Sequence, residues 1–217
     1  MQAMKDKRLV WSELPQGRTP NQRMDVMLSD ERKLDIMMFK SALVRRGHRS
    51  DRYQPGITIK NVKHPASVMV WGYFSRCDGR SSLDFLVKGV TMKAVNYLDI
   101  IEWKLVPKFR AKRCSCYQQD LAPCHITKIC KQVFEQARVP LLAWPENSPD
   151  LNPIENDWNW MKDILQQRFY TNIDELKKEP IRVWTTIMTP KYCRTLAESM
   201  PRRIWAVQAA GGHQTKY

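Results

Sequence analysis

The sequence predicts one large globular domain with an α/β fold, and three observations support this prediction. Strand-like and helix-like segments alternate through most of the chain, and its C-terminal part is helical. The chain has 217 residues, of which 43% are hydrophobic, enough for one large core and too many for a mainly disordered chain. No apolar run reaches the ~18 residues that a membrane-spanning helix needs. We therefore expect one large globular domain and no membrane partner.

Short apolar runs predict the strands, and apolar spacing of three or four residues predicts the helices. Strands are expected at 24–29, 34–39, 67–74, 83–87, 114–119 and 140–144. Helices are expected at 91–105, stopped by Pro107, and at 127–137, 154–169, 173–188 and 190–199. Residues 67–74 are apolar on both alternating faces, which is typical of a central strand. Residues 1–23 are a polar lead-in, and residues 44–64 form a basic hairpin or loop.

The charge balance is strongly basic. The 36 Lys and Arg residues outnumber the 22 Asp and Glu residues, for a formal net charge of +14. Such an excess favours a polyanionic partner, most simply nucleic acid. The alternatives are a merely soluble basic protein and a protein that binds anionic membranes or ribosomes. The basic residues are spread along the chain, so they are expected to decorate a folded surface.

Three carboxylates are candidates for a metal site. Asp30 and Asp120 each follow a predicted strand, at the sheet edge where ligands of α/β proteins bind. Glu155 lies at the start of the helix predicted for 154–169, after a Pro-rich loop. If the three converge, they form an all-oxygen site for Mg²⁺ or Mn²⁺, the kind that serves phosphodiester chemistry.

Each acid also has a purely structural interpretation. Asp30 fits an ordinary turn residue, and Asp120 fits a cap of the loop that follows it. Asn152-Pro153-Ile154-Glu155 fits a capping box with Pro at its favoured position, and a capping Glu needs no metal.

Several segments resemble a known family. YQQDLAPCH (117–125), WPENSPDLNPIENDW (144–158) and SVMVWGYFS (67–75) are similar to the DDE catalytic domain of Tc/mariner-superfamily transposases, on the Tc-like branch. LSDERKL (28–34) resembles that family's first-aspartate strand, and SMPRR (199–203) with the terminal GGHQTKY resembles its C-terminus. The resemblance covers residues 24–217, so we place the catalytic domain there.

The resemblance implies an RNase H-like fold, with a mixed central sheet flanked by helices. It implies that Asp30, Asp120 and Glu155 hold Mg²⁺ or Mn²⁺; the 34 residues between the last two match the Tc-like spacing. The implied reaction is cut-and-paste DNA transposition: water attacks at the element ends, and the freed 3′-hydroxyls attack target DNA. The implied partners are double-stranded DNA, as transposon ends and a TA target, and a second copy in a homodimer. The implied location is the nucleus.

The sequence departs from the family pattern at several points. Leu121 stands where the family usually has Asn, and Leu34 where it usually has Phe. The stretch from Asp30 to Val68 is shorter or more scrambled than usual. Residues 1–23 cannot hold the family's two N-terminal helix-turn-helix units, so we interpret the chain as a truncated copy. The departures favour an alternative function: a catalytically inactive or co-opted transposase-derived module that binds DNA.

The remaining polar clusters give weaker hypotheses. Backbone contacts to DNA are assigned to Arg45, Arg46, Lys60, Lys63, His125 and Lys128. His125 equally fits a hydrogen-bonded loop histidine. The cysteines at 114, 116, 124 and 130 lack the paired spacing of a zinc site, and the expected absence of a secretory signal favours reduced thiols. No Gly-rich phosphate loop and no serine-hydrolase elbow occurs in the sequence.

Overall fold

A computed structural model describes residues 2–13, 24–35, 67–86, 91–111, 114–168, 170 and 172–217. The proposed DNA contacts at Arg45, Arg46, Lys60 and Lys63 lie outside these ranges, as do the basic segment 44–64 and the strand predicted beyond Asp35. Among the described residues, no helix has both the length and the apolar character needed to cross a membrane.

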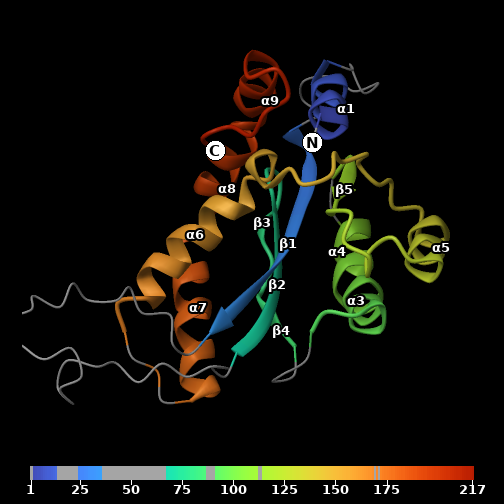
Figure 1. Ribbon diagram of the computed structural model, residues 1–217. Coiled ribbons are helices and arrows are strands. Elements are labelled where there is room, and N and C mark those ends of the chain that lie inside the picture. The colour runs from blue at the N-terminus through green and yellow to red at the C-terminus, as the bar shows by residue number, and fades with distance from the viewer. Residues whose placement is uncertain are drawn as a thin grey trace, which may run out of the picture.

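The described strands form one mixed sheet (Figure 1). They are β1 (Val26–Asp35), β2 (Ser67–Ser75), β3 (Gly79–Arg80), β4 (Asp84–Phe85) and β5 (Cys116–Gln118). The order is β3-β2-β1-β5, with β4 also paired to β2. β1 runs antiparallel to β2 and parallel to β5, so the sheet is mixed, as the sequence predicts.

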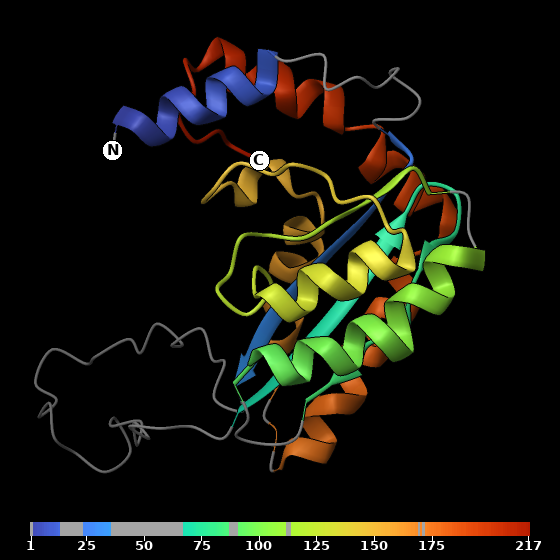
Figure 2. The ribbon, with the colours of Figure 1, turned by 90° about the vertical axis from the view of Figure 1, so that its right-hand side faces the viewer.

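Helices cover both faces of the sheet (Figures 1 and 2). One face carries α3 (Ala94–Ile100), a π-helical turn (Ile101–Leu105), α4 (Val106–Ala111) and α5 (Lys128–Ala137). The other carries α6 (Ile154–Leu165), α7 (Ile173–Ile187) and α8 (Pro190–Ala197). α1 (Gln2–Glu13) packs beside α9 (Met200–Ala209) at one end of the molecule, near the 3₁₀ turn η2 (Pro149–Leu151).

The central strand β2 contributes side chains to a core on each face of the sheet. Val68, Val70 and Phe74 point to the core beneath α6 and α7, whereas Trp71 and Tyr73 point to the core beneath α3 and α5. All five side chains are buried. A strand covered on both sides needs apolar residues on both faces, so the prediction of a central strand at 67–74 is confirmed.

Two predicted boundaries are wrong. β1 does not end before Asp30: its pairing with β2 continues through Glu31 to Asp35, because a long antiparallel partner satisfies the backbone of the polar stretch as well. Pro107 does not end the helix that begins near residue 94. The chain passes through the π turn and continues directly as α4, so Pro107 lies inside a continuous helical segment, just after the π turn.

Candidate functional site

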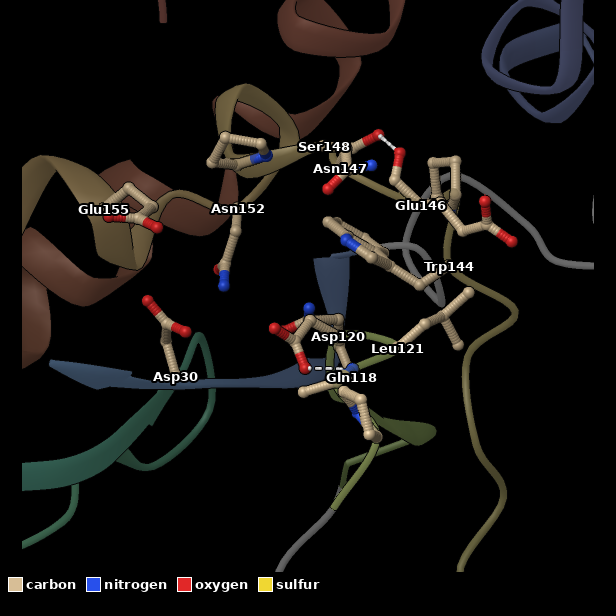
Figure 3. Close-up of a pocket in the computed structure, with 14 residues that line it drawn as sticks. Asp30, Gln118, Asp120, Leu121, Trp144, Glu146, Asn147, Ser148, Asn152 and Glu155 are labelled. Atoms are coloured by element: carbon tan, nitrogen blue, oxygen red, sulfur yellow. Dashed lines mark hydrogen bonds between the residues drawn. The ribbon is translucent and has the colours of Figure 1, made fainter. Parts of the chain in front are cut away.

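The three candidate acids line one cavity of about 450 Å³ (Figure 3). Asp30 lies in the middle of β1, Asp120 lies two residues after β5, and Glu155 lies in the first turn of α6. Figure 3 shows the three carboxylates turned toward the same space. Residues far apart in the sequence are thus brought together at one edge of the sheet, as the sequence analysis expected.

The register of two parallel strands brings the aspartates together. Leu28 of β1 lies opposite Gln118 of β5, and each aspartate comes two residues later in its own strand direction. Since side chains alternate along an extended chain, two residues keep the same side. Ser29, which precedes Asp30 in β1, adds a further bond between the two strands: its hydroxyl donates to the Gln118 carbonyl of β5 at 3.0 Å.

Glu155 reaches the cavity because a polar loop closes over the sheet edge. The side-chain amide of Asn152 donates to the Ser29 carbonyl at 3.1 Å, next to Asp30. The capping-box interpretation of Glu155 is wrong. The capping box requires the Asn152 N–H to donate to the Glu155 carboxylate, but this N–H donates to the Pro149 carbonyl. Only the Asn152 side chain caps the helix, since its oxygen accepts from the Ile154 N–H at 3.4 Å. The carboxylate lies 3.7 Å from an Arg32 guanidinium nitrogen.

The cavity concentrates negative charge around Asp30. Burial of Asp30, together with the neighbouring charges of Glu155, Glu31 and Asp120, raises the pKa of the Asp30 carboxyl well above its usual value. A divalent cation would offset this repulsion, and an all-carboxylate set is the donor chemistry that Mg²⁺ and Mn²⁺ prefer. In chemistry and charge the residues therefore fit such an ion. Within the described ranges, however, no three His, Cys, Asp or Glu side chains are gathered closely enough to share one ion.

His125 lies inside the protein, 2% exposed, between two carboxylates. Its ring nitrogens lie 2.6 Å from Asp120 and 3.4 Å from Glu31, ion-pair distances at which neither ring N–H is aligned for a hydrogen bond. Burial opposes the charged form, but the two carboxylates outweigh it and raise the pKa of His125 to about 11. The ring also packs on Tyr97, with centroids 4.0 Å apart.

The Asp120 carboxylate is held ionised by its partners. Burial favours its neutral form, but the contact with His125 and the Ala122 N–H, which donates at 2.9 Å, lower the pKa of Asp120 below its usual value. His125 thus holds the Asp120 carboxylate in place from inside the protein. Because it is buried, His125 presents little surface to a DNA phosphate. The sequence analysis did not identify Glu31 and Tyr97 as partners of His125.

Lys128 is the other candidate DNA contact within the described ranges. It is exposed in the first turn of α5, after Thr127, whose hydroxyl accepts from the Cys130 N–H at 3.4 Å. Helix N-termini and basic side chains both favour phosphate, so its placement fits a backbone contact. The cysteines are free, and three of them, at 116, 130 and 193, are buried.

Comparison with known proteins identifies the domain as a DDE-type nuclease domain. Residues 81–177, which include Asp120 and Glu155, match the family model described as DDE superfamily endonuclease. The chain is 36% identical over 215 residues to the transposable element Tcb1 transposase of Caenorhabditis briggsae, covering 97% of this chain and 77% of that protein. It is 33% identical over 194 residues to the Tc1 transposase of Caenorhabditis elegans, covering 87% and 69%. The chain belongs to the Tc1/mariner transposase family.

Solved structures share the fold. The Mos1 mariner paired-end complex with Mn has a TM-score of 0.81 at 18% identity, covering 100% of this chain and 64% of that chain. The catalytic domain of Mos1 mariner transposase covers 100% of this chain and 97% of that one, with a TM-score of 0.72 at 15% identity. The expected RNase H-like fold is therefore confirmed, and the chain is a transposase catalytic domain of the phosphodiester-cleaving class.

Proposed function

We propose that this domain cleaves DNA at transposon ends and joins them to target DNA, with Mg²⁺ or Mn²⁺ held by Asp30, Asp120 and Glu155. The observation that carries this proposal is the single cavity lined by three carboxylates from three elements. When bound, the divalent ion supplies activation of the attacking water or 3′-hydroxyl and stabilisation of the leaving oxygen. The protein positions that ion: the β1–β5 register sets the two aspartates, and the loop before α6 sets Glu155.

The proposed substrate is double-stranded DNA, as transposon ends and a TA target. The net charge of +14 supports a polyanionic substrate. Solved Mos1 structures include a paired-end complex with the left transposon end and a strand transfer complex, which support end binding by two copies of this chain. The same proposal implies a nuclear location, because the proposed substrates are chromosomal DNA.

Glu155→Gln should reduce Mn²⁺-dependent DNA nicking by about 10²-fold or more without lowering the melting temperature measured with chelator, because it also removes a charge that repels Asp30. The amide keeps the size of the side chain but loses the charge that would bind a cation, and no capping bond is lost because Glu155 makes none. The measurement is plasmid nicking with Mn²⁺, beside a thermal melt. Glu135→Gln, an exposed change on α5, is the matched control and should nick like the parent chain.

Calorimetry tests the site directly. Mn²⁺ should bind saturably to the parent chain, and Asp120→Ala should remove that binding, in the presence of a DNA duplex if the free chain binds weakly. Retained Mn²⁺ binding or nicking in a folded Asp120→Ala variant would show that the ion is held elsewhere.

DNA affinity should fall steeply with salt, since each phosphate contact releases a counterion. Lys128→Ala should lower the slope of log affinity against log salt by about 1, if Lys128 contacts one phosphate. Lys178→Ala provides the control, because this exposed lysine lies on α7, on the opposite face of the sheet. Fluorescence anisotropy with a labelled duplex at several salt concentrations gives both slopes, and equal slopes would remove Lys128 from the interface.

One observation favours the second function, a catalytically inactive DNA-binding module. Leu121 is 41% exposed and lines the cavity beside Asp120, so the cavity wall next to the proposed ion site carries an apolar side chain. A folded parent chain that binds DNA but neither binds Mn²⁺ nor nicks would support this module. Gain of nicking in Leu121→Asn would then assign the loss of activity to that residue.

A further inference from the structure

Arg8 of α1 is a buried charge whose hydrogen bonds converge on the loop before α6. Its residue is 2% exposed, and its guanidinium forms a bidentate ion pair with Asp150, at 2.9 and 2.7 Å. The remaining donors go to the Ser148 hydroxyl at 2.6 Å and to the carbonyls of Gly212 and His213 at 2.9 and 3.1 Å. These five bonds use the full donor capacity of an arginine.

Asp150 is equally saturated by groups from the other end of the chain. The backbone N–H and hydroxyl of Thr215 donate to its carboxylate at 2.9 and 3.0 Å. Its carbonyl accepts from Arg203 of α9 at 2.8 Å, and Arg203 also donates to Asn156 in the first turn of α6 at 3.1 Å. The turn η2 is therefore held from α1, from α9 and from the C-terminal segment.

The loop fixed in this way is one wall of the acidic cavity. Ser148, Pro149 and Asn152 line the cavity on either side of Asp150, and Glu155 follows at the start of α6. Asn152 donates to Ser29, the residue before Asp30. Arg8 thus binds Asp150, the backbone leads from Asp150 to Asn152 two residues later, and Asn152 binds the strand that carries Asp30.

The buried ion pair is a costly way to attach a helix. Two buried charges lose their hydration, and an apolar pair of similar size often stabilises a fold as well or better. Apolar contacts at this end are already available, since Trp144, Leu151, Met200 and Val207 form a small core against which Trp11 packs. The ion pair adds what apolar packing lacks: directional bonds that fix the loop in one position.

We propose that Arg8 is a positioning residue for the catalytic cavity: through Asp150 it fixes loop 144–152, and thereby the place of Glu155 relative to Asp30. The consequence for function rests on the proposed metal-dependent activity, whereas the consequence for the loop does not. Helix α1, which carries Arg8, is accordingly part of the catalytic domain.

The test compares Arg8→Met and Asp150→Asn with Val183→Ala in the full chain. Val183 is buried in the core beneath α7, so its variant loses stability without touching the loop. Hydrogen exchange of residues 144–152 should become faster by roughly tenfold in the two loop variants, at a temperature where each variant is folded. Mn²⁺ affinity should fall about tenfold or more. Val183→Ala should change neither quantity.

The outcomes separate this inference from the proposed function. Unchanged loop exchange in a folded Arg8→Met chain overturns the positioning role, whatever the activity. Faster loop exchange with unchanged Mn²⁺ affinity and nicking overturns it as well, because the loop would then not set the site. A third outcome is faster loop exchange in Arg8→Met together with a parent chain that neither binds Mn²⁺ nor nicks DNA. This result would support the role of Arg8 in fixing the loop and refute the proposed function. If Arg8→Met does not fold, Arg8→Lys, which keeps the charge but not the bidentate pair, should give the same changes in smaller size.

Discussion

Asp30→Asn should abolish metal-dependent DNA cleavage and, measured with chelator at neutral pH, raise the melting temperature. The loss of cleavage is expected to exceed about 10³-fold, because losing a metal ligand removes several kcal/mol of transition-state stabilisation. The gain in stability follows from charge, since ionised Asp30 lies partly buried among Glu155, Glu31 and Asp120. Removing a charge from this cluster relieves repulsion that the unfolded chain does not have.

The pH dependence gives the sign of this effect. Folding raises the pKa of Asp30, so the folded state binds more protons than the unfolded state at the same pH. Its contribution to stability is therefore most favourable below the ordinary pKa of about 4 and is lost as the pH rises toward the raised value. The gain in melting temperature of Asp30→Asn over the parent chain should thus grow as the pH rises from about 4 toward the raised pKa, and it should be absent at lower pH. Thermal melts from pH 3 to 8 measure it.

The control for this prediction is Asp35→Asn, at the C-terminal end of β1 and outside the cavity. It should retain cleavage and lack the gain in melting temperature at neutral pH. A lower melting temperature for Asp30→Asn would show that the Asp30 carboxylate stabilises the fold, and persistent cleavage would exclude it as a ligand.

Trp158→Ala should lower the free energy of unfolding by about 3–5 kcal/mol, the usual cost of a large buried aromatic, and the melting temperature by about 6–20 °C. Trp158 is 1% exposed in α6 and stacks on Trp184 of α7, with centroids 5.3 Å apart and planes 14° apart. Trp184 in turn lies against Gly72, whose strand partner is Asp30; a Cβ at Gly72 would come within 3.3 Å of it. The stack therefore supports the helix that carries Glu155, and it packs against β2 at the residue paired with Asp30.

Trp160→Ala is the matched control on the same helix. Trp160 is 47% exposed and meets only the edge of Tyr192 among the aromatic rings of the described structure. Its removal should cost about 1 kcal/mol or less. Urea unfolding of both variants gives the comparison, and similar losses would mean that the stack contributes little.

The sequence predicts the parts of this molecule that rest on periodic apolar patterns. The two-faced strand around Trp71 and the helix that begins at Ile154 are confirmed close to their expected limits. The meeting of Asp30, Asp120 and Glu155 in one cavity was expected from the family resemblance, whereas their positions in the sequence alone also allowed structural interpretations. In each case local chemistry and tertiary packing favour the same structure.

Features that depend on distant partners could not be predicted. β1 continues past Asp30 because β2 offers a long antiparallel partner. The polar residues Glu31 to Lys33 carry no apolar pattern from which a strand could be predicted. The burial of His125 requires Glu31 from another strand and Tyr97 from α3. Asn152 and Glu155 satisfy the sequence pattern of a capping box, but the strand edge and Arg32 supply partners that the pattern does not include.

The contacts of α1 have a consequence for folding kinetics. Arg8 bonds to Gly212 and His213 across 204 and 205 positions of the chain, and Ser12 accepts from Gln208 across 196. Closing loops of this length costs entropy that is repaid only once both ends have a surface to meet, so these bonds form after the sheet and its helices. Interactions formed after the transition state slow unfolding and leave the folding rate unchanged. We therefore expect substitutions in the first described helix to change mainly how long the folded domain lasts, and substitutions in the central sheet to change mainly how fast it forms.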